Sequence, residues 1–395
     1  MLLIPTQVLK PGMTLAQPIY HPLAESCMLL NKGVEVRADY IAKLNELGVT
    51  NVWIHFEGLE APEGATTESI SAEHMHLYEA INSSIDHLER RVEVKLNLHQ
   101  YRKAVHSMLA GIVENPHHNV VTHQLASCGS MLTGHMANCC YLSLLVGAHM
   151  TGYLKNERST LPADVAENTS ELGVGTLLHD IGKLQMPEEM QSKSVLDPEE
   201  DWPEYRYHVR AGYDEAREHV SVVASNTIYN HHQRYDGSGF PRRKARRSGE
   251  CAEPLAGRQI HIFSRILAVV DAFDHLLCPA GTPVPTIIAI HGLKSTRFDG
   301  WFDPVVTETL LRLVPPFQVG CLVILSDGKQ AVVVRNHPEA PCRPLVRLVR
   351  GQVGDASARA EVRQLDLRMC RNLSVAVVGN VDIRDYVFTG ELEPV

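Results

Sequence analysis

A histidine and an aspartate stand side by side in the stretch Leu177-Leu178-His179-Asp180-Ile181-Gly182-Lys183. A neutral imidazole binds a transition metal through one ring nitrogen, and a carboxylate has two oxygens that can bridge two metals. Lys183 lies four residues after His179, so on a helix the two side chains would share one face. There the lysine would act as a point charge on an anion. The stretch therefore predicts a metal site that handles phosphate, although a helix end with a stray polar pair explains it about equally well.

Other histidines and one more aspartate favour the metal site. Asp271 interrupts the apolar run Ile266–Val270, where a carboxylate is costly unless it is paired or binds a metal. Any single histidine is more simply explained as a core or surface residue. The full set of candidate ligands is harder to explain in that way: His135, His179, Asp180, His208, His231, His232 and Asp271.

The composition is that of an ordinary globular protein and narrows the class of ligand. The 395 residues include 44% hydrophobic and 21% charged residues, with a formal net charge of -9. We therefore expect no broad basic surface and no binding to long nucleic acid, and local cations would have to attract a phosphate ester.

The cysteines and the hydropathy bear on the compartment. Nine cysteines without a Cys-x-x-Cys pair indicate a reduced, cytoplasmic chain. The sequence shows no secretory signal and no apolar run of about 18 residues, so we expect no membrane span.

The pattern along the chain predicts a mainly α protein in four parts. Residues 1–60 read as a small N-terminal α+β regulatory module, and residues 61–103 as a linker followed by a long amphipathic helix. That helix would pack on the rest of the chain or pair with a second copy in a homodimer. Residues 104–315 are helical almost throughout and contain the candidate ligands. Residues 316–395 read as a small β appendage and tail, with strands expected at 320–325, 331–335, 345–349 and 375–378.

At this point the motifs resemble those of a known family. They are His135-x-x-Asn138, His179-Asp180-x-Gly182-Lys183, His208-x-x-x-Gly212-Tyr213, His231-His232 with Asp236-Gly237-x-Gly239-x-Pro241, and Asp271-x-x-Asp274. Over roughly residues 104–350 the chain resembles an HD-GYP domain protein. This is the branch of the HD metal-dependent phosphohydrolases that cleaves cyclic di-GMP.

The resemblance implies a binuclear site and a reaction. His135, His179, Asp180 and Asp271 would hold one divalent ion, iron or manganese, and Asp180 would bridge to a second ion held by His208, His231 and His232. A bridging hydroxide would open cyclic di-GMP to linear pGpG, with Asp180 and Lys183 as catalytic residues and Lys183 on the scissile phosphate. A signalling protein is the partner implied for the loop Gly239-Phe240-Pro241.

Departures from the family pattern leave the substrate open. Met131 stands where some relatives carry a glutamate that helps bind a third metal. The signature Gly-Tyr-Pro reads Gly239-Phe240-Pro241, and Gln233 replaces the usual glutamate. Residues 278–283 lack the arginine and lysine that grip the substrate phosphates in the family, a role that Arg242 and Arg243 would have to fill. The alternatives are hydrolysis of another cyclic dinucleotide or nucleotide, and a catalytically weak scaffold that senses a nucleotide.

Overall fold

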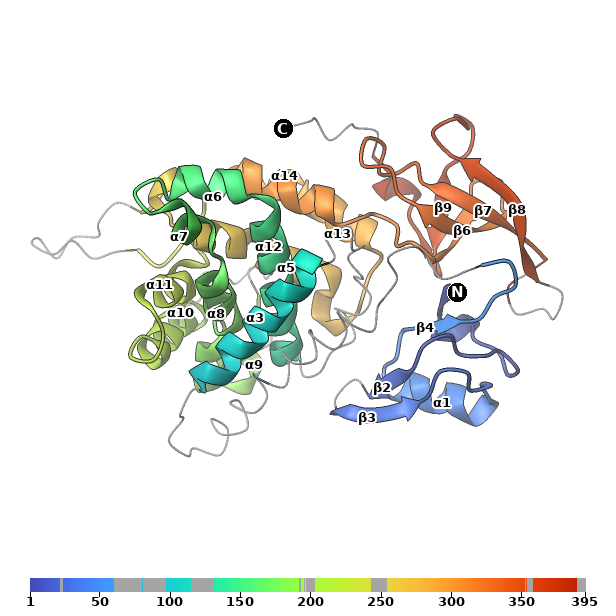
Figure 1. Ribbon diagram of the computed structural model, residues 1–395, viewed down its shortest axis with the longest axis horizontal. Coiled ribbons are helices and arrows are strands. Elements are labelled where there is room, and N and C mark those ends of the chain that lie inside the picture. The colour runs from blue at the N-terminus through green and yellow to red at the C-terminus, as the bar shows by residue number, and fades with distance from the viewer. Residues whose placement is uncertain are drawn as a thin grey trace, which may run out of the picture.

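The computed structural model describes residues 1–21, 24–59, 80, 97–114, 131–191, 193–194, 196, 203–242, 254–351, 353 and 358–388. A helical body forms one side of the molecule, and strands from both ends of the chain form the other side (Figure 1). The mainly α fold with a C-terminal β appendage is thereby confirmed. The long helix expected within residues 61–103 depends on residues 77–92, which apart from residue 80 lie outside the described residues, and so its role in a homodimer stays a prediction.

The helical body is built around two long apolar helices that cross in its centre, α5 and α12. Residues 262–274 of α12 are all buried, which explains why this run could be so apolar. The helices of this body are α3 (Leu98–Glu114), α5 (Met131–His149), α6 (Thr151–Glu157), α7 (Ala163–Glu167), α8 (Ser170–Leu177), α9 (Glu188–Gln191), α10 (Pro203–Ala216), α11 (Val222–Asn230), α12 (Ile262–Leu277), α13 (Thr286–Leu293) and α14 (Pro304–Leu313). Among the described residues, none of the helices has the length and hydropathy that crossing a bilayer requires.

Helix α3 runs through the boundary expected between residues 103 and 104. Tyr101, Val105, Met108 and Ile112 are buried in one core cluster, at the spacing of a single helical face. The helix therefore starts at Leu98, and its first turn already belongs to the helical body.

The stretch around His179 is not one continuous helix, so His179 and Lys183 do not share a helical face as the sequence analysis considered. Helix α8 ends at Leu177, and after Asp180 the chain continues as a short 3-10 helix, η2 (Ile181–Gln185). Tight packing of η2 on α10 explains the change. A Cβ atom at Gly182 would lie 2.0 Å from the backbone oxygen of His208, so only glycine allows this approach.

The C-terminal strands form one antiparallel sheet in the order β10-β9-β5-β6-β7-β8. All four expected strands are present, but two further strands were missed. The sheet consists of β5 (Leu322–Leu325), β6 (Gln330–Arg335), β7 (Leu345–Arg350), β8 (Arg359–Asp366), β9 (Val375–Val378) and β10 (Val381–Asp382). Strand β8 carries several charged residues and only one buried residue, so it lacks the apolar pattern by which strands are predicted.

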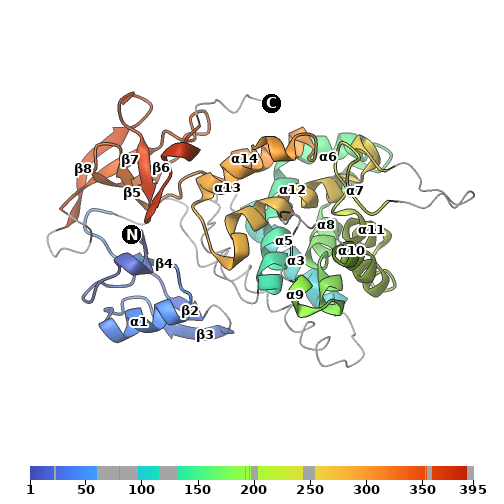
Figure 2. The same cartoon turned by 180° about the vertical axis from the view of Figure 1, so that it is seen from behind.

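The N-terminal residues share a core with this sheet (Figure 2). They form β1 (Leu2–Pro5), β2 (Ile19–His21), β3 (Ala24–Leu30), α1 (Ala38–Glu46) and β4 (Asn51–Ile54). The backbone N–H of Leu3 donates to Gly320 at 2.9 Å. Leu322 and Val332 of the sheet lie in the same apolar cluster as Leu2 and Ile4. The two ends of the chain therefore form one β-rich body, which the sequence did not predict.

Candidate metal centre

Three candidate ligands from three elements meet on one side of the site. His135 comes from α5, His179 follows α8, and Asp271 comes from α12. Nε2 of His135 lies 3.2 Å from Nε2 of His179 and 3.1 Å from Oδ1 of Asp271. All three side chains are buried. Contacts of this length join ligands that surround one ion, because metal–ligand distances of about 2.0–2.2 Å place neighbouring ligands roughly 3 Å apart.

A second group of three histidines lies beside the first group. His208 comes from α10, and His231 and His232 follow α11. Nε2 of His208 lies 3.3 Å from Nε2 of His231 and 3.1 Å from Nε2 of His232. These three rings are buried as well, so this group also offers nitrogen ligands to one ion.

Asp180 lies between the two groups and presents one oxygen to each. Its Oδ2 is 3.7 Å from His135 and 3.6 Å from His179, whereas its Oδ1 is 3.4 Å from His208 and 3.8 Å from His231. Both oxygens are buried; Oδ1 accepts no hydrogen bond from the described residues, and Nζ of Lys183 lies 2.6 Å from Oδ2. A buried carboxylate in this state is costly unless cations complete it, and its two oxygens are placed to bridge two ions.

The imidazole rings are held so that their lone pairs converge. The Nδ1 atoms of His179 and His231 lie 2.7 Å from the carbonyl oxygens of Thr176 and Ile228, and Nδ1 of His208 contacts the carbonyl of Tyr205. A carbonyl oxygen only accepts, so in a neutral ring Nδ1 carries the proton and Nε2 keeps a free lone pair. Lone pairs that face one another repel unless a cation lies between them. The donor set therefore fits divalent metal ions, and the backbone supplies the orienting contacts that metal-binding histidines usually have.

The pKa values agree with neutral, metal-ready histidines. Burial lowers the pKa of His179 and His231 to about 4 each, and that of His208 to about 3. Burial opposes the ionisation of Asp180, but Lys183 and then the surrounding histidines hold its pKa well below the usual value. At neutral pH these three histidines and Asp180 are therefore in the forms that bind metal. The pKa of His135 is instead raised, because Cys139, Asp271 and Asp274 outweigh the effect of its burial.

Lys183 is buried inside the site and contacts the bridging candidate. Its Nζ lies 2.6 Å from Oδ2 of Asp180 and donates to the carbonyl of Lys193 at 3.0 Å. The lysine is only 2% exposed. Its position beside Asp180 places a cation where a substrate phosphate would meet the metals. This position is consistent with a phosphate contact, and that role stays a prediction.

Two side chains that the sequence reasoning missed also reach this centre. His275 lies four residues after Asp271 on α12, its Nε2 is 3.4 Å from Oδ1 of Asp271, and its ring stacks on His135 at 4.2 Å. Cys139 lies four residues after His135 on α5, and its Sγ is 3.7 Å from Nδ1 of that histidine. Burial raises the pKa of the Cys139 thiol to about 12. A search for ligand types one helical turn after each predicted ligand would have found both residues.

Asp274 and Asn138 support the first histidine. Oδ2 of Asp274 lies 2.7 Å from Nδ1 of His135, and the side-chain amide of Asn138 donates to Oδ1 of Asp274 at 3.0 Å. This chain of contacts fixes the ring of His135 with Nε2 directed at the site.

The expected substrate and partner contacts are less defined. Arg242 is exposed, and Arg243 lies outside the described residues. Phe240 is buried at 6% exposure in a cluster with Tyr205, and its ring lies 4.8 Å from that of His232. The loop Gly239-Phe240-Pro241 therefore supports His232 from behind, and the aromatic ring is not available to a partner protein.

Comparisons with known proteins identify the matching families. A family model described as HD domain matches residues 150–306, and one described as KOW domain associated with HD domain matches residues 322–386. A cyclic di-GMP phosphodiesterase from Pseudomonas aeruginosa is 30% identical over 183 residues, which are 45% of this chain and 41% of that protein. A 3'3'-cGAMP-specific phosphodiesterase from Vibrio cholerae is 28% identical over 167 residues, which are 42% of this chain and 25% of that protein.

The matches cover less than half the length of these curated relatives. A solved structure of an HDG"Y"P protein from Bdellovibrio bacteriovorus aligns with 78% of this chain and 97% of its own chain, at 15% identity and a TM-score of 0.43.

Proposed function

The chain belongs to the HD-GYP branch of the HD-domain proteins, and from this premise we propose that it is a metal-dependent phosphodiesterase that hydrolyses cyclic di-GMP to linear pGpG. The position of Asp180 carries the proposal. Its Oδ2 faces His135 and His179 and its Oδ1 faces His208 and His231, an arrangement suited to two metal ions in addition to the contact with Lys183. We propose iron or manganese, because the ligands are nitrogen and oxygen atoms.

Each part of the chain has a defined task in this proposal. His135, His179 and Asp271 would hold one ion, the three other histidines would hold the second, and Asp180 would bridge them. When bound, the ions supply a water of lowered pKa and offset charge on the phosphoryl group. Lys183 binds a phosphate oxygen, and the apolar core around α5 and α12 keeps the ligands rigid and excludes bulk water.

Another cyclic dinucleotide is the second candidate substrate. Residues 278–283 lack the cations expected after Asp274, and one relative is named as specific for 3'3'-cGAMP. A metal centre sets the reaction, whereas contacts outside it choose the bases and the second phosphate. A nucleotide-binding scaffold without turnover is the remaining alternative.

Turnover of a substrate panel tests the proposal. Anaerobically purified protein, loaded with iron or manganese, is incubated with cyclic di-GMP, 3'3'-cGAMP and cyclic di-AMP, and the products are separated by chromatography. We expect pGpG from cyclic di-GMP and no turnover by Asp180→Asn, which loses the bridging charge. Faster cleavage of 3'3'-cGAMP would establish the second candidate. Binding of a nucleotide without any cleavage would establish the scaffold.

Metal analysis of the same preparation tests the binuclear site. We expect about two ions per wild-type chain, because the proposed ligands surround two positions. Met131 stands where some relatives carry the glutamate that helps bind a third ion. Asp180→Ala is expected to lose both ions. Three ions per chain would contradict the assignment.

A further inference from the structure

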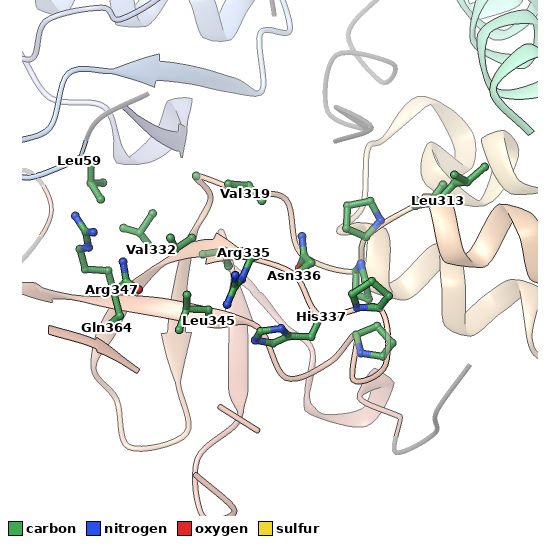
Figure 3. A pocket seen from close by; sticks show the side chains of 18 of the residues that line it. Leu59, Leu313, Val319, Val332, Arg335, Asn336, His337, Leu345, Arg347 and Gln364 are labelled. Carbon is green, nitrogen blue, oxygen red and sulfur yellow. The ribbon is translucent and has the colours of Figure 1, made fainter. Parts of the chain in front are cut away.

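A second cavity lies away from the metal centre, where three parts of the chain meet. It measures about 970 Å³ and is bounded by the C-terminal sheet, by the segment that leaves α14 and by Leu59 of the N-terminal part (Figure 3). Its size is at the upper end of the range of about 300–1,000 Å³ that is usual for small-molecule sites. None of the proposed metal ligands lines it.

Neighbouring strands present one continuous row of side chains to this cavity. Arg347 of β7 pairs with Val332 of β6 on one side and with Gln364 of β8 on the other. All three residues line the cavity (Figure 3). The sheet therefore provides a floor on which one cation and one amide stand side by side, because directly paired residues project from the same face.

An irregularity in β6 adds a second arginine to this floor. The register of β6 against β7 shifts between Val333 and Arg335, so that Arg335 pairs with Leu345. Such irregularities re-aim side chains and occur often beside functional sites. Both Arg335 and Leu345 line the cavity (Figure 3).

The charge of the lining points to an anion. Arg312, Arg335 and Arg347 line the cavity, and none of the described lining residues is Asp or Glu, in a chain of net charge -9. Arg312 is paired with Glu308, whereas Arg335 has no ion-pair partner among the described residues. Nη1 of Arg347 donates to the carbonyl of Gly58 at 2.6 Å, but its Nε is buried and donates no hydrogen bond within this described part. Guanidinium groups in such a state are suited to phosphate oxygens.

The same lining also has an acceptor without a donor. The side chain of Asn336 donates to the carbonyl of Phe317 at 2.8 Å, but its Oδ1 is buried and accepts no hydrogen bond from the residues described. A buried acceptor that lacks a donor is suited to a ligand that carries an N–H or O–H group. The apolar side chains of Leu59, Val319 and Leu345 would pack against the flat ring of a ligand.

We propose that this cavity is a second ligand site, separate from the metal centre, for a phosphate ester of nucleotide size. Arg335 and Arg347 bind the phosphate, and Asn336 accepts a hydrogen bond from the base or sugar. Because α14 lies in the helical body and packs against α5 and α12, the bound ligand would connect the sheet with the helices that carry His135 and Asp271. The proposal does not depend on the activity proposed above.

Calorimetric titration of the full-length, metal-loaded protein with GMP tests this site. Arg335→Gln is the decisive variant, because Arg335 is exposed and its replacement leaves the core intact. We expect it to weaken GMP binding by about tenfold to a hundredfold, the effect of one charge-assisted hydrogen bond. Guanosine, which lacks the phosphate, is expected to bind wild type no more tightly than it binds the variant.

Arg363→Gln is the matched control. Arg363 is also an exposed arginine of the sheet, but it does not line the cavity. We expect wild-type affinity for GMP and unchanged thermal unfolding. If GMP bound only at the metal centre, Arg335→Gln would bind it as tightly as wild type, and that result, or no binding at all, would overturn the proposal.

Discussion

The buried ion pair between Lys183 and Asp180 predicts a stability that depends on bound metal. The two charged atoms are 2.6 Å apart, and the side chains are 2% and 1% exposed. At an effective dielectric constant of about 20, unit charges at this separation attract by roughly 6 kcal/mol. After desolvation is counted, removing one partner of a buried pair costs about 3–5 kcal/mol, because the other charge stays buried.

Lys183→Met removes the charge but keeps most of the side-chain volume. In metal-free protein we expect the full loss of about 3–5 kcal/mol in the free energy of unfolding. In metal-loaded protein the ions compensate Asp180, so the loss falls to about 1 kcal/mol, near the value of the lost hydrogen bond to Lys193. Metal should therefore stabilise the variant by about 2–4 kcal/mol more than it stabilises wild type. Turnover by the metal-loaded variant should also fall, since the phosphate contact is gone.

Urea unfolding with saturating Mn²⁺ and with a chelator measures both losses. Arg210→Met is the control, because it breaks an exposed pair with Asp214 and should cost under about 1 kcal/mol with or without metal. An equal loss for Lys183→Met in both states would refute the reasoning, since it would mean that no cation joins Asp180 when metal is added.

Four further changes test other parts of the molecule. Gly182→Ala should lower metal content and stability strongly, because its Cβ would meet a carbonyl of α10 at 2.0 Å; elemental analysis and thermal unfolding measure this. His261 accepts a hydrogen bond from Phe263 at the start of α12, and its pKa is lowered from 6.5 to about 4, first by burial. This contribution to stability is complete above about pH 6.5 and is lost as the pH falls towards 4, so His261→Asn should lose less stability in that interval, as urea unfolding at several pH values would show. Ala280→Arg should tighten cyclic di-GMP binding about tenfold by restoring a phosphate contact, measured by calorimetry. A chain that starts near residue 66 should keep its metals but expose the apolar side of the sheet, which elemental analysis and light scattering would detect.

Each of these expectations can fail in a distinct way. Normal metal content in Gly182→Ala would mean that η2 can move away from α10. Identical pH curves for His261→Asn and wild type would mean that this histidine titrates normally. Unchanged affinity in Ala280→Arg would mean either that Arg242 or Arg243 already binds the phosphate or that the pocket serves a different nucleotide. Replacing both arginines with alanine would abolish binding in the first case and barely change it in the second. Metal loss on truncation would show that the N-terminal part completes the site.

Residue types and short spacings were enough to predict the mainly α fold and most of the candidate site. The apolar run around Asp271 predicted α12 within its observed bounds, because helical periodicity is a local property of the sequence. The pair His179-Asp180 and the double histidine His231-His232 could be recognised because metal chemistry limits the residue types. The ligand assignments themselves remain predictions.

The tertiary structure decided what local patterns do not encode. Only the folded chain shows that one oxygen of Asp180 faces each group of histidines and that the ring of His275 stacks on His135. Only the folded chain shows that Leu3 lies against Gly320, so that both chain ends share one core. Strand β8 was missed because pairing with β7 holds it in place, while its own residues are mostly polar and only one of them is buried. In each case the deciding contact joins residues far apart in sequence, where the periodicity of either segment carries no information about its partner.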